Sequence, residues 1–147
     1  MTMAATNEQP RLAGRVLEEG RVGPLTRTHF VRYAGAGGDF NPIHHDDEFA
    51  RSAGYPSVFG HGMLTAGLLS DFVVQRFGLH NLRRFSVRYV GQVWPGDVLV
   101  FSGHSIAAAE GEDPRRAAYE LKVERIGPDG QRNTVLTGGA TVAGEDA

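Results

Sequence analysis

The sequence predicts a single α+β domain in which a curled antiparallel sheet wraps around one long helix. Two observations predict it: an apolar helical segment near the middle of the chain, and a run of four strand-like segments after it. The length of 147 residues suits one domain with a proper core. Contents of 41% hydrophobic and 22% charged residues are ordinary for a soluble globular protein.

The composition also argues against several classes of function. A formal net charge of -2 gives no basic field that would attract nucleic acid or an anionic membrane. The absence of cysteine excludes disulfides, cysteine zinc sites and thiol nucleophiles, and it fits a reducing cytoplasm. No apolar run reaches the length of a membrane span. Residues 1–13 lack the apolar core of a signal peptide, so we expect a flexible tail there and a cytoplasmic protein.

The first elements are short. Residues 14–19 predict a first strand, and "PLTRTHFVRYAGAGG" predicts a helix with Thr26 as its N-cap. The capping box is incomplete by sequence, because His29 stands where Glu or Gln is usual. Glycines end this helix at positions Gly35, Gly37 and Gly38. A second short helix is predicted from about Asp46 to Gly54, with two acidic residues in its first turn.

The segment "HGMLTAGLLSDFVVQRFG", from His61 to Gly78, predicts the long helix. Its apolar residues cover most of the circumference: Met63, Leu64, Ala66, Leu68, Leu69, Phe72, Val73 and Phe77. A helix that is apolar nearly all round is buried rather than lying on a surface.

Four strands are predicted after this helix, at residues 82–93, 98–107, 117–126 and 134–142. The turns "WPGD", "AEGEDP" and "GPDG" separate them, which is typical of antiparallel neighbours. A sheet that curls around the helix explains why the helix has so little polar surface.

The stretch "GGDFNPIHHDDEFA" carries the candidate chemistry. Pro42 fixes its own φ and keeps Asn41 out of helical geometry, so the chain can bend between Asp39 and His44. Such a bend can bring a carboxylate to an imidazole, and histidine is the side chain best suited to proton transfer near neutral pH.

Two other interpretations of this stretch stay open at this point. A metal site would use His44, His45, an acid and His61, but neighbouring residues of an extended chain point to opposite faces and no HExxH or Cys/His pattern is present. Alternatively, Asp39, Asn41 and Asp46 are turn and cap residues, because Asn, Asp and Pro dominate turns for local reasons.

The start of the long helix adds a second feature. Its first backbone N–H groups lack intrahelical acceptors and lie at the positive end of the helix. Gly62, without a Cβ, lets an oxygen atom approach them, which suits the carbonyl of a thioester in its transition state. Gly62 can equally serve close packing alone. Ser70, two turns later, either faces the same side or bonds a preceding carbonyl.

The segment "YAGAGGDFNPIHHDDEFA", followed by "HGMLTAGLLSDFV", closely resembles the MaoC-like dehydratases. This family includes (R)-specific enoyl-CoA hydratases and bacterial (3R)-hydroxyacyl-ACP dehydratases, and the chain is particularly similar to the catalytic subunits of actinobacterial mycolic-acid dehydratases. The resemblance runs from about Pro24 to Gly139. Its signature residues are Tyr33, Gly38, Asp39, Asn41, Pro42, Ile43, His44 and Ala50.

The resemblance implies a hot-dog fold over residues 14–143, with short tails at 1–13 and 144–147. It implies that Asp39 and His44 form the catalytic pair, that the Gly62 amide is the oxyanion donor, and that Asn41 and Ser70 support the site. It implies no metal and no organic cofactor. The family's Phe-x-x-Pro-Val-x-Pro-Gly-Asp run appears here as "YVGQVWPGD", with changes that bear on the acyl or pantetheine path.

The activity implied by the resemblance is reversible hydration of a trans-2-enoyl thioester, carried by CoA or ACP, to the (3R)-3-hydroxyacyl thioester. A hot-dog thioesterase and a non-catalytic acyl-binding partner subunit are the alternatives, and such subunits commonly lack the Asp/His pair that this chain keeps. We expect a homodimer or a heterodimer with a paralogous subunit. Arg83, Arg84 and Arg88 are candidates for contacts with CoA phosphates or an acidic carrier protein, or they form a solvated strand face.

Overall fold

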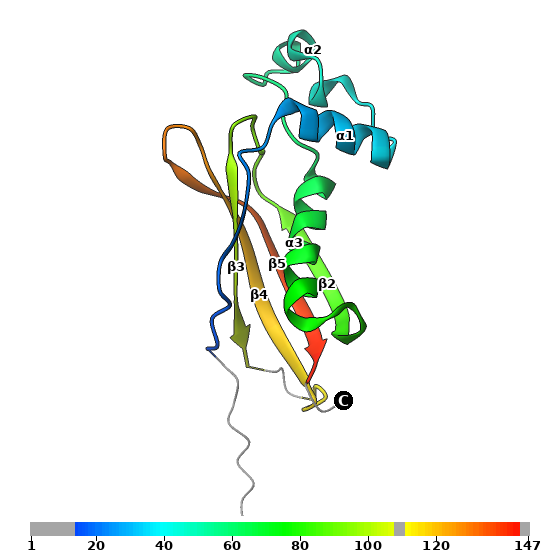
Figure 1. The fold of residues 1–147 in the computed structure, drawn as a ribbon, viewed down its shortest axis with the longest axis vertical. Helices are drawn as coiled ribbons and strands as arrows, with labels where there is room; N and C mark the ends of the chain where they lie inside the picture. The colour runs from blue at the N-terminus through cyan, green and yellow to red at the C-terminus, as the bar shows by residue number, and fades with distance from the viewer. Residues whose placement is uncertain (1–13, 108–110, 145–147) are drawn as a thin grey trace, which may run out of the picture.

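A twisted five-stranded antiparallel sheet with one long helix along one face forms the body of the protein (Figure 1). The computed structural model describes residues 14–107 and 111–144. The strands are β1 (Gly20–Val22), β2 (Leu82–Tyr89), β3 (Val98–Ile106), β4 (Arg116–Ile126) and β5 (Arg132–Ala143). Their order across the sheet is β1-β3-β4-β5-β2, so β2 is an edge strand with one neighbour. The α+β hot-dog architecture is therefore the one that the sequence predicts.

The long helix α3 (Gly62–Phe77) matches the predicted segment, with His61 as its N-cap. Its buried residues face the core side of the sheet: Thr65, Ala66, Leu69, Phe72 and Val73. Sheet residues such as Leu99, Val123 and Leu136 complete this core, and each such side chain contributes about 1.5–3 kcal/mol by leaving water. The prediction of burial nearly all round holds for one side only, because Met63 is 62% exposed.

The first strand lies later than predicted. Residues 14–19 run beside β3 with a single isolated bridge, from Val16 to His104. The Arg15 amide donates to the Ser105 hydroxyl rather than to a carbonyl, which interrupts the regular ladder. Regular pairing begins at Gly20, where a Cβ would lie 2.8 Å from the Phe72 ring of α3, so glycine lets the strand pass close to the helix.

A cap of short helices covers the N-terminal end of α3 (Figure 1). It consists of α1 (Arg27–Gly37), the 3₁₀ helix η1 (Pro42–His44) and α2 (Asp47–Ser52). Thr26 is the N-cap of α1 as predicted, but the capping box is complete: His29 Nδ1 accepts from the Thr26 amide at 2.9 Å. The His29 imidazole thus accepts the hydrogen bond that a glutamate side chain usually accepts in a capping box. Asp46 caps α2 by accepting from two amides, at 2.9 and 3.1 Å.

The other predicted strands agree with β3, β4 and β5 within two residues at each end. The first, predicted over 82–93, ends at Tyr89 because the Val90 and Gly91 amides both donate to the Val135 carbonyl, at 3.0 and 3.2 Å. A short 3₁₀ helix, η2 (Leu79–Asn81), connects α3 to β2. The predicted tails lie outside the described residues, apart from Gly144. No helix in the described ranges is long and apolar enough to span a membrane.

Candidate active site

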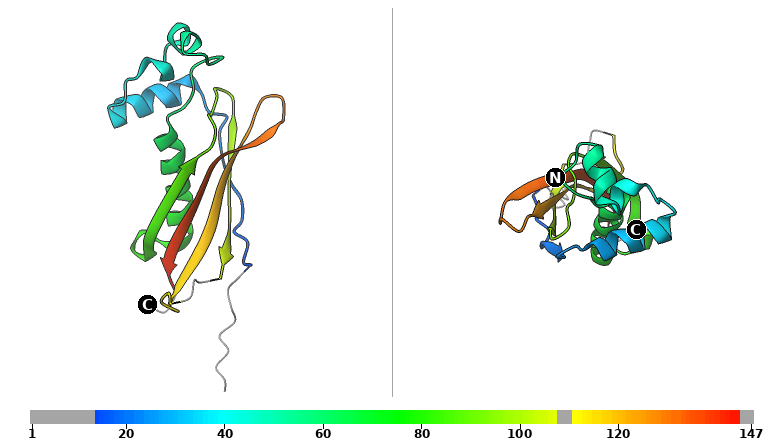
Figure 2. Two further views of the ribbon diagram at one scale, coloured as in Figure 1. Left: turned by 180° about the vertical axis from the view of Figure 1, so that it is seen from behind. Right: turned by 90° about the horizontal axis from the view of Figure 1, so that it is seen from above.

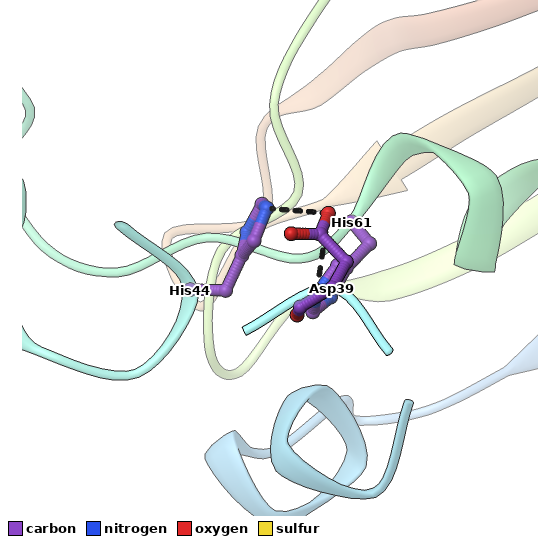
Figure 3. Close-up of side chains that lie close together, drawn as sticks. All are labelled: Asp39, His44 and His61. Carbon is purple, nitrogen blue, oxygen red and sulfur yellow. Dashed lines mark hydrogen bonds and ion pairs between the residues drawn. The ribbon is translucent and has the colours of Figure 1, made fainter. Parts of the chain in front are cut away.

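Three side chains meet where the helical cap touches the start of α3 (Figure 3). Gly38, in the left-handed region at φ 72°, ends α1 and turns the chain into Asp39. His44 is the last residue of the short helix η1. Pro42 is its first residue, and the fixed φ of proline suits the start of a helix. His61 arrives from the N-cap of α3, so residues 22 positions apart in the chain become neighbours.

Asp39 Oδ2 lies 3.7 Å from His44 Nε2 and 3.9 Å from His61 Nε2. The two imidazole rings stack with their centroids 3.7 Å apart and an interplanar angle of 26°. Both histidines are buried, whereas the Asp39 side chain is 55% exposed. The predicted pairing of Asp39 with His44 is therefore present, with the carboxylate at the open side and a gap slightly too long for a direct hydrogen bond.

The hydrogen-bond partner of His44 fixes its tautomer. Nδ1 lies 2.8 Å from the Phe59 carbonyl oxygen, which can only accept, so Nδ1 carries the hydrogen. In the neutral ring Nε2 then offers its lone pair towards Asp39. Burial lowers the pKa of His44, and repulsion from His61 acts in the same direction, while the Phe59 carbonyl and Asp39 oppose them. His44 is thus suited to accept a proton near neutral pH.

His61 is the member of this cluster that sequence reasoning missed as a neighbour of the Asp39–His44 pair, since we weighed it only as a metal ligand. Its Nε2 lies 3.0 Å from the Asp39 carbonyl oxygen, so Nε2 is the donor. Its Nδ1 is buried and has no hydrogen-bond partner among the described residues. The signal available in the sequence was its place directly before Gly62, at the head of the apolar helix.

The same three residues are also the candidate metal ligands. One ligand atom from each of Asp39, His44 and His61 lies within 4.8 Å of the others. However, His61 Nε2 carries a proton that it donates to the Asp39 carbonyl. While this hydrogen bond is present, Nε2 has no lone pair with which to bind a metal ion. One imidazole and one carboxylate remain, fewer than the three protein ligands of a typical zinc site. His45 lies apart, with Nε2 3.1 Å from the Phe40 carbonyl.

A cleft of about 350 Å³ opens in front of this cluster. It is lined by Tyr33, Gly37, Asp39, His44, His61, Gly62, Met63 and Tyr89. Gly62 therefore lies in the cleft beside the pair, and its role as oxyanion donor stays a prediction. A Cβ at this position would come within 3.0 Å of Cε1 of Tyr89, so glycine allows the ring of Tyr89 to lie against the first turn of α3.

The two predicted supporting residues differ in position. The Asn41 side chain caps η1 by accepting from the Ile43 amide at 3.1 Å, and the Asn41 amide donates to Asp39 Oδ1 at 3.2 Å. Asn41 therefore helps to orient the carboxylate. Ser70 donates instead to the Gly67 carbonyl at 2.9 Å within α3 and does not line the cleft.

The three arginines of β2 do not form one group. Arg84 pairs with Thr141 and Arg88 with Thr137, on the sheet face opposite to Phe85 and Val87, which pack against the core. The guanidinium of Arg83 donates to the His80 carbonyl. Arg84 and Arg88 therefore face away from the cleft, whose wall on this strand is Tyr89.

Comparison with known proteins shows the family of this chain. Residues 9–124 match the family described as MaoC like domain. The enoyl-CoA hydratase 2, peroxisomal, of Arabidopsis thaliana is 30% identical over 110 residues, which are 73% of this chain and 32% of the relative. The 3-hydroxyacyl-thioester dehydratase X of Mycobacterium tuberculosis is 39% identical over 69 residues, 47% of this chain and 24% of the relative. The chain spans less than a third of the length of either relative.

Among solved structures, the unliganded (R)-hydratase PhaJ1 of Pseudomonas aeruginosa superimposes with a TM-score of 0.73. The match covers 90% of this chain and 82% of that one at 22% identity, and at that identity it shows the fold alone. Because the family match extends over most of the sequence, the chain belongs to the MaoC-like dehydratase family and has its hot-dog fold.

Proposed function

We propose that this domain reversibly hydrates trans-2-enoyl thioesters to (3R)-3-hydroxyacyl thioesters. One observation carries the proposal: a buried imidazole whose free Nε2 faces a carboxylate at 3.7 Å, beside the first turn of a helix. The names of the relatives, an enoyl-CoA hydratase and a 3-hydroxyacyl-thioester dehydratase, support the same chemistry.

In the hydration direction, His44 Nε2 takes a proton from water while the water oxygen bonds to C3 of the enoyl group. The electron pair of the C2–C3 double bond moves towards the thioester carbonyl and gives an enolate. Asp39 Oδ2, which lies 3.7 Å from Nε2 without substrate, receives that proton when the two groups close to hydrogen-bond distance, and delivers it to C2. One water has then been added across the double bond, and both side chains have returned to their starting states.

The first turn of α3 supplies the electrostatic part of this proposal. Gly62 opens the helix, so its N–H has no intrahelical acceptor and lies at the positive end of the helix dipole. A donor in this place stabilises the negative charge that the carbonyl oxygen gains in the enolate. The reaction proposed for these residues takes its acidity from the thioester, so the proposal includes no metal or organic cofactor.

A thioesterase is the second candidate, because a carboxylate and a helix N-terminus also suit attack on the thioester carbon. The relatives favour hydration, since they are named as an enoyl-CoA hydratase and a 3-hydroxyacyl-thioester dehydratase. Release of free thiol separates the two reactions.

We further infer that the domain works as a dimer, with itself or with a paralogous chain. The eight residues of β2 form an edge with one neighbour, and exposed apolar side chains lie next to it, at Met63, Tyr89 and Val90. An unpaired edge of this length favours pairing with another strand. Light scattering of the purified protein should give twice the mass of one chain, and a monomer would contradict the inference.

The activity test uses a short trans-2-enoyl-CoA and the matching enoyl-ACP. We expect the absorbance of the conjugated thioester to fall, with formation of the (3R) alcohol and no free thiol. Thiol release without hydration would replace the proposal with the thioesterase, and the faster substrate would identify the carrier.

A further inference from the structure

His61 lines the cleft, yet the proposed reaction gives it no step. It is 3% exposed and comes from a different element than the reacting pair, the N-cap of α3. Its contacts reach both Asp39 and His44, which makes it the side chain that connects them.

The first contact holds the main chain of Asp39. The His61 Nε2–H donates to the Asp39 carbonyl at 3.0 Å, while the Asn41 amide holds Asp39 Oδ1 at 3.2 Å. The residue is thus fixed at its backbone from α3 and at its carboxylate from the loop. Without the His61 bond, the loop after α1 would lose its polar connection to the start of α3.

The second contact holds the plane of the His44 ring. His61 stacks on one face of it at 3.7 Å, and Phe59 meets it edge-on at 5.3 Å with an interplanar angle of 81°. With Nδ1 tied to the Phe59 carbonyl, the ring of His44 has little freedom to rotate. His61 is itself supported by Tyr33, whose ring centroid is 5.0 Å away.

A side chain that served packing alone would not need two ring nitrogens here. His61 Nδ1 is buried without a partner among the described residues, and an unsatisfied buried acceptor carries a free-energy cost. A phenyl ring would fill similar space without that cost. An unsatisfied buried polar atom in a residue that lines a cleft therefore points to a role in function.

We propose that His61 is a positioning residue that holds Asp39 and His44 at the separation required for proton transfer between them. The inference rests on the proposed hydration, because it concerns the same pair. His61 acts through its Nε2–H on the Asp39 backbone and through its ring on His44.

An electrostatic consequence follows for His44. The groups that face or adjoin it are Asp39, His45 and His61, and the cleft adds two phenols, Tyr33 of α1 and Tyr89 of β2. Burial is the main cause of its lowered pKa, and His61 lowers that pKa further by like-charge repulsion. Replacing His61 with an uncharged ring keeps the burial and removes the repulsion, so the pKa of His44 should rise.

Two substitutions separate the two contacts. His61→Phe keeps a stacked ring and removes the donor, whereas His61→Gln keeps an amide donor near the position of Nε2 and removes the ring. We expect kcat to fall about 10- to 100-fold in His61→Phe, since a displacement of about 1 Å can cost that much, with KM within about twofold. His61→Gln should lose about 3- to 10-fold. His45→Gln, an exposed neighbour outside the cleft, is the control and should keep wild-type kcat within about twofold.

NMR of the imidazole protons follows the titration of His44 and measures the change in its pKa without any substrate. In His61→Phe the titration and the acidic limb of kcat/KM should both move to higher pH. Unchanged kcat with an unchanged titration in both variants would overturn the inference. So would a loss of activity that only follows a loss of folded protein, measured by circular dichroism. If the wild type fails to hydrate enoyl thioesters, the proposed function fails, while the titration still decides the role of His61.

Discussion

Two histidine–carboxylate pairs among the described residues, His44–Asp39 and His104–Glu120, differ in their surroundings. In the cleft, His44 and Asp39 are 3.7 Å apart, and on the outer face of the sheet His104 Nε2 and Glu120 Oε2 are 3.4 Å apart. The outer pair spans the adjacent strands β3 and β4 and lines a larger hollow, of about 870 Å³. Figure 2 shows that this face carries no helix among the described residues. If only the distance and the cavity size counted, the outer pair would be the better candidate for the active site.

The surroundings of the two pairs favour the pair in the cleft instead. The side chains of His104 and Glu120 are 51% and 65% exposed, so water screens their interaction. His44 is buried, a carbonyl fixes its tautomer, a second imidazole covers its face, and the first turn of α3 lies beside it. The two pairs thus differ in burial and in hydrogen bonding far more than in the distance between their charged groups.

The largest effect should come from removing the carboxylate of the pair in the cleft, whereas the matched change in the outer pair should have almost none. Asp39→Asn should reduce kcat by about 10²- to 10⁴-fold, the usual contribution of a positioned acid or base. Glu120→Gln is the matched change in the outer pair and should leave kcat within about twofold. Enoyl-CoA hydration measures both, and equal effects would remove the distinction between the two pairs.

A second difference is the helix start, which the outer pair lacks. Gly62→Pro removes the N–H of the first helical residue, a position where proline is tolerated, and Gly62→Ala keeps the N–H and adds a Cβ. Both changes crowd Tyr89. The ratio of kcat between the two variants therefore measures the contribution of the Gly62 N–H donor alone. We expect kcat of the proline variant to lie about 10²- to 10³-fold below that of the alanine variant. Equal rates would place the oxyanion donor elsewhere.

The sequence predicted the elements that depend on local pattern. The apolar run from Met63 predicted α3, and the Asn41-Pro42 step predicted the bend that joins Asp39 to His44. The position of His61 could not be predicted in the same way, because its contact with the Asp39 carbonyl forms only when α3 meets the loop. The shifted first strand likewise depends on a tertiary contact, the approach of Gly20 to Phe72. One-sided burial of α3 reflects its packing against one face of a single sheet, which no local pattern reveals.

The smallest effect should come from the arginines on the outer face. Charge reversal in Arg84→Glu/Arg88→Glu should change KM for the enoyl-CoA less than about threefold, because both side chains project from the face opposite to the cleft. Initial rates at several substrate concentrations give this value. A large rise in KM with unchanged kcat would show that the carrier group reaches the outer face.

The most direct test of the account is the pH dependence of enoyl-CoA hydration in the wild type and in His44→Gln. Because His44 must be neutral to accept a proton, wild-type kcat/KM should fall only as the pH drops below the ordinary histidine value of 6.5, through its lowered pKa. His44→Gln should retain at most about 1% of the rate and lose this acidic limb. The same rate and the same limb in His44→Gln would contradict the assignment of His44 as the base.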